Sequence, residues 1–370
     1  SRPLAGEATA FARTMAAAPE RVVAVDVPSG LEGDTGKALG GDCARAALTV
    51  TFVRKKAAHV LMPGRAHCGD VVVADIGVPA EIVAAQNVKL WENGPEVWGK
   101  SFPWPSLDAH KHTRGSVVVA SGGHMHTGAA RLAARAALRA GAGLVTVISP
   151  ADAAAENAAQ LTAIMLRQAD APEAFTAAFA NARCAVIGPA FGTSAVEAAK
   201  LGAALTAQGR CPIVIDADAI TVLAPIQRTL LAEDVLTPHV GEFKRAFPGL
   251  IEACATRIDA ARQAAARAGC VVVLKGPDTV VAAPDGRAVV NTTGTPFLAT
   301  AGSGDVLAGL VAGLVGQGMA SFEAASAASW LHGKAAEVFG PGLIAEDLPE
   351  ILPRVLNRLG EELAQMHPNR

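Results

Sequence analysis

The stretch A-T-A-G-S-G-D occupies residues 299–305, and an apolar segment that begins at Val306 follows it directly. No charged residue interrupts this segment before Glu323. Several glycines break it up, and it is shorter than the roughly 20 strongly apolar residues that a membrane span needs. The pattern therefore predicts a helix buried in a protein core, with a glycine-rich loop before it.

The glycines of this loop suit it to hold an anion. Backbone N–H groups without flanking side chains can converge on an anion, and the start of a helix adds a partial positive charge. Asp305 stands in the first turn of the predicted helix. A bound phosphate would raise the pKa of this carboxyl group and suit it to take a proton from an attacking hydroxyl. The alternative is that Asp305 only caps the helix.

A second loop, residues 274–279, reads L-K-G-P-D-T and follows an apolar run that is typical of a buried strand. Lys275 then stands at the carboxyl end of a strand, where α/β proteins bind ligands, and its charge can neutralise a phosphate. The sequence A-P-D-G at 283–286 predicts a hairpin turn between the two loops. Together they predict a nucleotide pocket, although this second loop alone would also suit a surface turn.

A third segment, T-P-H-V-G-E at residues 237–242, follows a predicted strand end and opens a helix. His239 is a candidate substrate contact, and Glu242 is a candidate to hold a metal-bound water near phosphate. A satisfied loop histidine is the alternative. Upstream, Asp216 and Asp218 end another strand with two carboxylates on one face. They either shape the same crevice or cap the next helix.

The segment Ser121–Gly128 joins a predicted strand to a helix, but it has neither GxGxxG nor GxxxxGK[ST] spacing. It therefore supports a Rossmann or P-loop nucleotide site only weakly. Three arginines follow at helical spacing: Arg131, Arg135 and Arg139. They predict a helix side that faces solvent or another subunit. The His-x-His pairs at 110–112 and 124–126 lack a third ligand, which argues against zinc.

The rest of the chain alternates apolar, β-branched runs with alanine-rich stretches. The predicted strands are 21–26, 48–53, 70–75, 116–120, 144–149, 184–187, 212–216 and 270–274. The predicted helices include 129–140, 194–207 and 255–268. Continuously apolar strands predict a parallel sheet covered on both faces, and their alternation with helices predicts an α/β fold.

The alternation fails between Pro79 and Asp108, where tryptophans and prolines predict a connector packed on a surface. We therefore expect two domains, 1–96 and 97–370. The first has three predicted strands and few helices, which is a thin core for an independent domain. Because the chain also opens on Ser1 rather than Met, we expect that an N-terminal part is missing or that this domain docks onto the second.

The composition argues against several classes of protein. Lys and Arg number 32 against 34 Asp and Glu, and this balance argues against nucleic acid as the main partner. Neither a membrane span nor a basic, then apolar signal segment is expected. Six cysteines without CxxC spacing predict reduced thiols in a cytoplasmic protein.

The motifs occur in the order found in a known family. Residues 108–355 resemble the C-terminal, ADP- or ATP-dependent (S)-NAD(P)H-hydrate dehydratase domain of bifunctional NAD(P)H-hydrate repair enzymes. The matching stretches are 110–115, 128–130, 140–143, 187–189, 216–218, 237–243, 274–276 and 302–307. The resemblance implies a ribokinase-like fold, a three-layer αβα sandwich.

The resemblance also implies roles for single residues. The expected nucleotide-binding positions are Lys275, Gly276, Pro277, Asp278, Thr279 and Gly304. The expected hydrate-binding positions are Ala129, Gly192, His239 and Asp305. Asp305 would also be the catalytic base, and Mg²⁺ would accompany the ADP or ATP. The chain departs from the pattern at His239, where related kinases often have Asn, and at Ala190, where the family usually has Gly.

The first 96 residues resemble the closing part of the partner domain, an NAD(P)H-hydrate epimerase of Rossmann-like α/β fold. The matching stretches are 23–31, 34–36, 49–52 and 75–78. The resemblance implies that Asp26 contacts the hydrate and that Ser29 ligates K⁺. The family's Asn-Asn-Gly-rich motif and its acidic K⁺ ligand have no counterpart in the sequence, so we expect an incomplete epimerase site. The resemblance further implies a homo-oligomer.

Two other functions fit the same motifs. A small-molecule kinase, such as a hydroxymethylpyrimidine or sugar kinase, would share the fold and release a stable phosphoester. A nucleotide-binding regulator without turnover would bind ADP and be indifferent to the loss of Asp305. The ordered set of matches favours the dehydratase.

Overall fold

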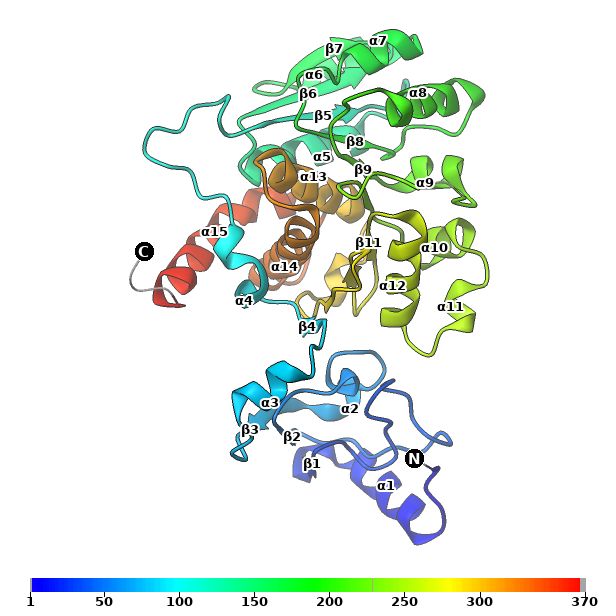
Figure 1. Cartoon of the computed structure of the whole chain (residues 1–370), viewed down its shortest axis with the longest axis vertical. Coiled ribbons are helices and arrows are strands. Elements are labelled where there is room, and N and C mark those ends of the chain that lie inside the picture. The colour runs from blue at the N-terminus through cyan, green and yellow to red at the C-terminus, as the bar shows by residue number, and fades with distance from the viewer. Residues whose placement is uncertain (1, 228, 367–370) are drawn as a thin grey trace. The chain divides into compact units, whose positions relative to one another are not determined.

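A computed structural model describes residues 2–227 and 229–366 (Figure 1). The chain divides into two compact units, Ser1–Glu92 and Asn93–Arg370. The boundary that we expected between residues 96 and 97 falls inside the short helix α4 (Pro95–Trp98).

The first unit is built on a parallel sheet with the strand order β1-β2-β3. The strands are β1 (Val23–Val25), β2 (Leu48–Phe52) and β3 (Asp70–Ala74). The other elements are α1 (Glu7–Ala17), η1 (Pro19–Arg21), η2 (Ala57–His59), α2 (Arg65–Cys68), α3 (Ala80–Ala85) and β4 (Leu90–Glu92). The three strands predicted for this unit are confirmed. Val23 and Val25 are 62% and 71% exposed, so these apolar side chains of β1 are largely uncovered.

A mostly parallel sheet forms the middle layer of the second unit, in the order β13-β12-β11-β10-β9-β8-β5-β6-β7. Its strands are β5 (Ser116–Ala120), β6 (Leu144–Ser149), β7 (Met165–Gln168), β8 (Cys184–Ile187), β9 (Ile213–Ile215), β10 (Val235–Leu236), β11 (Val271–Leu274), β12 (Val280–Ala282) and β13 (Ala288–Val290). The pairs from β11 to β7 are parallel, whereas β12 pairs antiparallel with β11 and β13. The hairpin predicted at 283–286 is therefore confirmed.

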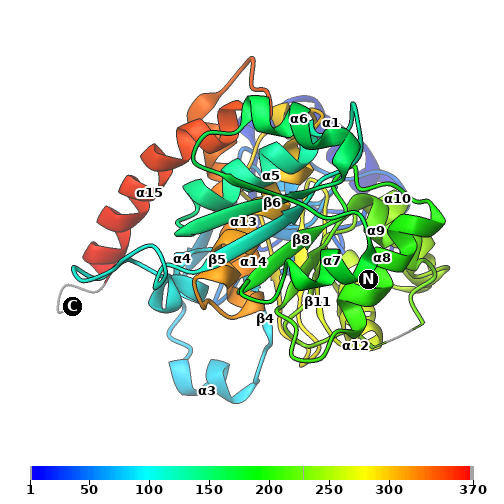
Figure 2. The same ribbon diagram turned by 90° about the horizontal axis from the view of Figure 1, so that it is seen from above.

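Helices cover both faces of this sheet (Figure 2). On one face lie α5 (Gly128–Arg139), α6 (Ala151–Gln160), α13 (Ser303–Gly316) and α14 (Ser321–Phe339), with α15 (Asp347–Met366) packed against α5 and α14. On the other lie α7 (Pro172–Ala177), α8 (Ala195–Thr206), α9 (Ala217–Leu223), α10 (Val240–Ala246) and α12 (Arg257–Ala268), with α11 (Leu250–Ala253) beside α12. Two short turns of helix, η3 (Gly99–Ser101) and η4 (Pro296–Leu298), complete the unit. The predicted three-layer αβα architecture is confirmed.

Helix α13 lies in the core of this unit. Its residues from Val306 to Gly316 are all buried, which confirms the buried helix predicted from the apolar run. Gly309 lets α13 lie directly against α5, because a Cβ atom there would be only 2.1 Å from the carbonyl oxygen of Ala133. This close packing fixes the start of α13 relative to the sheet. Across the described part of the chain, no helix has the length and apolarity to cross a membrane.

The expectation of a connector packed on a surface is wrong for the segment around Trp98. This side chain is only 1% exposed, and its ring centroid lies 5.7 Å from that of Trp330 and 5.8 Å from that of Phe102. Its Nε1–H donates a hydrogen bond of 3.1 Å to Asn93 Oδ1. The segment therefore belongs to the core of the second unit. Helix α4 has only four residues, too few to show a helical period in the sequence.

Candidate active site

The carboxyl ends of strands β5, β8, β9, β10 and β11 carry the loops singled out in the second unit. Because neighbouring parallel strands end at the same edge of a sheet, their following loops meet there. This edge faces the first turn of α13, where Asp305 lies. The sequence motifs, although far apart along the chain, are therefore brought to one place.

The glycine before α13 shapes the start of this helix. Gly302 has a φ of 87°, a left-handed conformation that favours glycine. A Cβ atom there would also lie 2.7 Å from the side chain of Leu132. The chain can therefore turn sharply into the helix. The first N–H groups of a helix have no partner within it, so the turn holding Gly304 and Asp305 can offer donors to an anion.

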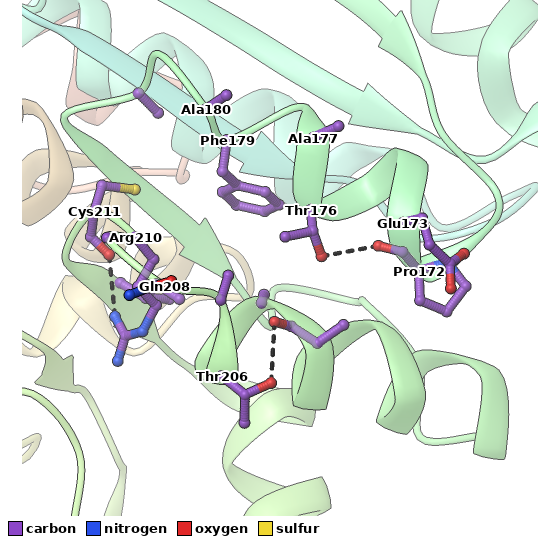
Figure 3. Close-up of a pocket in the computed structure, with 16 residues that line it drawn as sticks. Pro172, Glu173, Thr176, Ala177, Phe179, Ala180, Thr206, Gln208, Arg210 and Cys211 are labelled. Atoms are coloured by element: carbon purple, nitrogen blue, oxygen red, sulfur yellow. Dashed lines mark hydrogen bonds between the residues drawn. The ribbon is translucent and has the colours of Figure 1, made fainter.

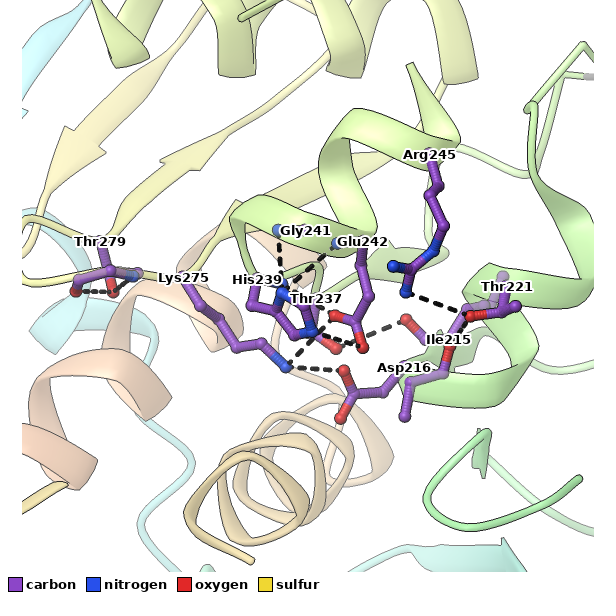
Figure 4. Close-up of polar contacts among 12 residues, drawn as sticks. Ile215, Asp216, Thr221, Thr237, His239, Gly241, Glu242, Arg245, Lys275 and Thr279 are labelled. Carbon is purple, nitrogen blue, oxygen red and sulfur yellow. Dashed lines mark hydrogen bonds and ion pairs between the residues drawn. The ribbon is translucent and has the colours of Figure 1, made fainter. Parts of the chain in front are cut away.

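Lys275 is the cationic centre of the site (Figure 4). Its Nζ lies 2.8 Å from Asp216 Oδ1 and 4.0 Å from Glu242 Oε2. A Cβ atom on Gly304 would lie 3.3 Å from the same Nζ, so the ammonium group also contacts the first turn of α13. Burial tends to lower the pKa of Lys275, but attraction to Asp216, Glu242 and Asp305 outweighs it and raises this pKa overall. A fixed positive charge therefore stands where a phosphate would bind.

Asp305 has the electrostatics of a base. Burial raises the pKa of its carboxyl group to about 6, repulsion from Asp216 and Glu242 acts in the same direction, and Lys275 acts against it. Among the described residues, no hydrogen bond to this carboxylate is present, because Lys275 donates to Asp216 instead. A carboxylate that titrates close to neutrality and has no donor bound to it is suited to accept a proton.

His239 caps helix α10 and remains accessible. Its ring Nδ1 accepts a hydrogen bond of 2.9 Å from the Gly241 N–H. Its backbone N–H donates a hydrogen bond of 2.8 Å to Glu242 Oε2. The Nε2 atom lies 3.3 Å from Glu242 Oε1, and the imidazole side chain is 55% exposed. Because Nδ1 is an acceptor, the neutral ring carries its proton on Nε2. The histidine thus caps the helix while presenting an exposed ring edge to a ligand.

The loop 276–279 is held from behind by Arg257, a residue that the sequence analysis missed. Its Nη2 donates to the carbonyl oxygen of Lys275 at 3.0 Å, and its Nε lies 3.2 Å from Asp278 Oδ1. Gly276 leaves room for this guanidinium, since a Cβ atom there would lie 2.4 Å from Arg257 Nη2. Gly276 and Pro277 are exposed, whereas Asp278 is only 2% exposed. The Asp278 side chain therefore braces the loop from inside.

Ala129 lies just after the loop 121–127 of the same edge, and Gly192 lies in the neighbouring loop after β8. Ala129 is in the first turn of α5, and the N–H of Gly192 donates to Asp218 Oδ2 at 2.9 Å. The two loops touch, because a Cβ atom on Gly122 would lie 2.0 Å from the carbonyl oxygen of Ala190. Ala190 has a φ of 50°, and an L-residue other than glycine pays about 1–2 kcal/mol for this conformation. That strain explains why glycine suits the position.

Asp26 and Ser29 lie in the first unit. Asp26 Oδ1 accepts hydrogen bonds from Lys56 Nζ at 2.5 Å and Thr51 Oγ1 at 2.8 Å. The Lys56 hydrogen bond is the main reason that the pKa of Asp26 lies below its usual value. Ser29 is exposed, and its carbonyl oxygen accepts from the N–H of Ala44 at 2.9 Å.

The helix after the loop 121–128 uses its arginines within the chain. Arg135 and Arg139 both pair with Glu350 of α15, with Arg135 Nε 2.5 Å from Oε1 and Arg139 Nη2 2.6 Å from Oε2. Both arginine side chains are more than 40% exposed, as expected for a solvent-facing side. In the loop itself, Thr127 Oγ1 donates to Glu156 at 2.5 Å.

A cavity of about 680 Å³ lies between α7 and α8, at the amino end of β9 (Figure 3). Its wall is mostly apolar, with Phe179 at one side and Arg210 at another. The guanidinium of Arg210 is already paired with the buried Asp234. None of the predicted site residues lines this cavity, so it is separate from the Asp305 site.

His332 of α14 is a second residue that sequence reasoning missed. Its Nε2 lies 2.9 Å from the carbonyl oxygen of Ser303, the first residue of α13. The only signal in the sequence was a lone histidine inside an otherwise apolar and small-residue stretch. Such a signal does not distinguish a core residue from one that supports a site.

Family comparisons place both units of the chain among known proteins. Residues 117–354 match the family described as NAD(P)H-hydrate dehydratase, and residues 1–58 match the family described as YjeF-related protein N-terminus. A bifunctional NAD(P)H-hydrate repair enzyme of Moorella thermoacetica is 38% identical over 368 residues, which cover 94% of this chain and 68% of that protein. The enzyme of the same name from Escherichia coli is 34% identical, with 92% and 66% covered.

Solved structures agree with this assignment. An ADP/ATP-dependent NAD(P)H-hydrate dehydratase of Bacillus subtilis, co-crystallised with ATP and Mg²⁺, matches with a TM-score of 0.63 and 30% identity. The match covers 74% of this chain and 99% of that one. A ribokinase-like superfamily protein of Enterococcus faecalis matches with a TM-score of 0.66 at 24% identity, covering 73% and 96%. The predicted ribokinase-like fold is confirmed.

Proposed function

This chain belongs to the NAD(P)H-hydrate dehydratase family, and we propose that residues 97–370 dehydrate (S)-NAD(P)H-hydrate at the expense of ADP or ATP. The enzyme is then a hydro-lyase of nicotinamide nucleotide repair. The observation that carries the proposal is the corner where Lys275 contacts the first turn of α13 beside Asp305. A phosphate held there lies next to a carboxylate with a pKa of about 6.

The chemistry begins with proton transfer to Asp305. The ring hydroxyl of the hydrate gives its proton to this carboxylate while its oxygen attacks the terminal phosphorus of the nucleotide. The bond from that phosphorus to the leaving nucleotide breaks, and a phosphorylated hydrate forms. Lys275 and the N–H groups at the start of α13 stabilise the negative charge on the transferred group.

The phosphorylated hydrate then loses phosphate. The lone pair of the ring nitrogen pushes the C–O bond to break, with the electron pair leaving on the phosphate. The adjacent ring carbon then gives a proton to solvent water, and the ring double bond forms. The net result is removal of water, and the nucleotide is hydrolysed in the process. Phosphate is a far better leaving group than hydroxide, which is the physical reason for spending a nucleotide.

Mg²⁺ fits this corner as a companion of the nucleotide. The described residues contain no group of three or more His, Cys, Asp or Glu side chains that could hold a metal by themselves. Mg²⁺ commonly binds through one or two carboxylates, waters and substrate phosphates, and Glu242 is 4.0 Å from Lys275 at this edge. Glu242 would therefore hold it through water. When bound, Mg²⁺ neutralises phosphate charge.

The geometry of this edge supports the substrate contacts that the family resemblance implies. We assign the exposed ring of His239, together with Ala129 and Gly192, to the hydrate, and the loop 275–279 with Gly304 to the nucleotide. Within that loop, the exposed backbone of Gly276 and Pro277 faces the nucleotide, whereas Asp278 acts through Arg257. Ala190 narrows the approach to Gly192 by one methyl group.

For residues 1–96, we propose part of an NAD(P)H-hydrate epimerase domain, supported by the match over 1–58. Asp26 would contact the hydrate and Ser29 would ligate K⁺. Lys56 already donates to the Asp26 carboxylate, so of these two residues only Ser29 is the proposed K⁺ ligand. A cytoplasmic homo-oligomer is a further part of the proposal, and light scattering of the purified chain tests the oligomer.

The test is an incubation of the protein with NADHX, Mg²⁺ and either ADP or ATP, followed by the absorbance of the recovered NADH. We expect recovery of NADH with release of one inorganic phosphate per NADH. Accumulation of a stable phosphoester would instead indicate the kinase alternative. Nucleotide binding without any turnover would indicate a regulator, and either result would overturn the dehydratase proposal.

A further inference from the structure

His332 lies on the buried side of helix α14, remote in sequence from every loop of the active site. Its side chain is 9% exposed in total, and its neighbours in sequence, Leu331 and Gly333, are buried as well. A histidine in such surroundings has to satisfy its polar atoms within the protein, because burying an unpaired polar group is costly. Its contacts therefore show what it does.

The contact of His332 is with the start of α13. Nε2 lies 2.9 Å from the carbonyl oxygen of Ser303. A carbonyl oxygen can only accept, so Nε2 carries the proton and His332 is the donor. Burial lowers the pKa of His332 to about 4. The positive charge of Lys275 lowers this pKa as well, whereas the hydrogen bond to Ser303 raises it. The side chain is therefore a neutral donor at physiological pH.

Ser303 is held from a second direction as well. Its Oγ donates a hydrogen bond of 2.8 Å to the carbonyl oxygen of Leu298, at the end of η4. The two bonds fix both the side chain and the peptide group of Ser303. The peptide group that His332 holds joins Ser303 directly to Gly304, and Asp305 follows. The orientation of these two residues relative to Lys275 depends on this peptide.

We propose that His332 is a positioning residue, which acts through the Ser303 carbonyl to hold Gly304 and Asp305 in register with Lys275. This inference rests on the dehydratase function proposed above. A neutral donor is required at this place. A lysine or arginine there would add a second buried cation under the influence of Lys275, and the two like charges would repel each other.

The experiment compares variants that keep or remove the donor in the full chain. His332→Gln keeps an N–H donor at a similar reach, whereas His332→Leu and His332→Met fill the space without one. We expect His332→Leu to lower kcat at least about tenfold, as the loss of one well-placed hydrogen bond would. The KM for nucleotide should rise less than kcat falls, because Arg257 holds the loop 275–279 independently and only the contact of Gly304 with the nucleotide is disturbed. His332→Gln should retain most of the wild-type kcat.

Melting temperatures measured on all variants separate this role from a structural one. If His332→Leu does not fold, His332→Met takes its place. The inference is overturned if a folded donorless variant turns over at the wild-type rate, if His332→Gln is as slow as His332→Leu, or if the loss lies in KM rather than kcat. Absence of turnover in the wild-type protein would count against the proposed function itself, and the positioning role would fall with it.

Discussion

Asp26 in the first unit and Asp305 in the second are both carboxylates close to a lysine, yet their pKa values move in opposite directions. At Asp26 the lysine donates directly to the carboxylate, and this hydrogen bond lowers the pKa. At Asp305 burial raises the pKa to about 6. The nearby Lys275 donates to Asp216 instead. The two pKa values differ first because Asp305 is the more deeply buried carboxylate, and second because only Asp26 receives a hydrogen bond from its lysine.

This difference separates two uses of an aspartate. A carboxylate that is partly exposed and bound by an ammonium group stays ionised over a wide pH range and can only accept hydrogen bonds. A buried carboxylate without a bound donor holds its proton more strongly and can exchange it near neutrality. Asp305 thus has the properties of a base, and Asp26 those of a fixed anionic contact.

The largest expected effect comes from removing the carboxylate that has no bound donor. We expect Asp305→Asn to lower kcat by about 10²–10⁴-fold, the usual contribution of general base catalysis. The nucleotide should still bind, because Lys275 and the loop 275–279 are unchanged. Steady-state turnover of NADHX and calorimetric titration with ADP and Mg²⁺ measure the two quantities.

The matched control for this variant is Asp259→Asn, which makes the same change in the first turn of α12. Asp259 accepts a hydrogen bond from Thr256 Oγ1 and lies outside the proposed site. We expect this control to keep its turnover. Retained turnover in Asp305→Asn would remove Asp305 from its role as the base.

The second effect comes from removing the lysine. Lys275→Met leaves Asp216 and Glu242 without their cation, and it also removes the attraction that lowers the pKa of Asp305. We expect kcat/KM to fall by about 10- to 100-fold, the range for loss of a charged hydrogen bond. The acid limb of the pH profile should move to higher pH, since the Asp305 pKa rises further.

A buried lysine elsewhere provides the control for this loss. Lys200 is 6% exposed and lies 4.0 Å from Glu197, in helix α8. Lys200→Met should change stability without moving the acid limb of kcat/KM. An unchanged acid limb in Lys275→Met would show that Lys275 does not act on Asp305.

Several helices, many of the strands and some residues of this site could be predicted from the sequence alone. Apolar runs were enough to predict β1, β2 and β3 and the buried strands β5, β6, β8, β9 and β11, and alanine-rich stretches were enough for helices α5, α8 and α12, because both are local properties. Strands β4 and β7 were missed, because they are short and largely exposed or half-buried and so form no apolar run. Glycines before a predicted helix were enough to single out Gly304 and Asp305. The hairpin turn followed from four consecutive residues.

The hydrogen-bond and ion-pair partners of the site residues could not be predicted from the sequence. Lys275 and Asp216 are 59 residues apart, and nothing local shows that this lysine binds Asp216 rather than Asp305. The inward direction of Asp278 depends on Arg257, and the role of His332 depends on a helix that packs against α13. Pairings of this kind are set by tertiary packing, which leaves no periodic trace in the sequence.

A third and smaller effect tests the origin of the raised pKa. In the wild-type protein, kcat/KM should rise with pH through about 6, because only ionised Asp305 accepts a proton. Asp216→Asn removes a neighbouring negative charge and frees Lys275 for Asp305. Both changes lower the pKa of Asp305, so the acid limb should move to lower pH, by about one unit.

Asp218→Asn is the control for this shift, because Asp218 is not among the groups that act on the Asp305 pKa. Its profile should keep the wild-type acid limb even if binding through Gly192 weakens. A limb that stays in place in Asp216→Asn would mean that burial alone sets the pKa of Asp305.

The smallest effect is expected in the first unit, where Lys56→Met removes the lysine that donates a hydrogen bond to Asp26. The carboxylate is 44% exposed and Lys56 is 32% exposed, so solvent screens the pair and Lys56→Met should lower the free energy of unfolding by less than about 1 kcal/mol. The sign follows from the lowered pKa of Asp26. Such a group stabilises the folded state above its unfolded pKa and loses this contribution as pH falls through the folded value. Urea unfolding at pH 7 and at acid pH should therefore show a difference between wild type and Lys56→Met that shrinks on acidification.

The control for this variant is Lys55→Met, which removes a lysine paired with Glu92 rather than with Asp26. An NMR titration of Lys55→Met should show the wild-type pKa of Asp26. If the pKa of Asp26 also stayed low in Lys56→Met, the hydrogen bond from Thr51 would be enough to lower it.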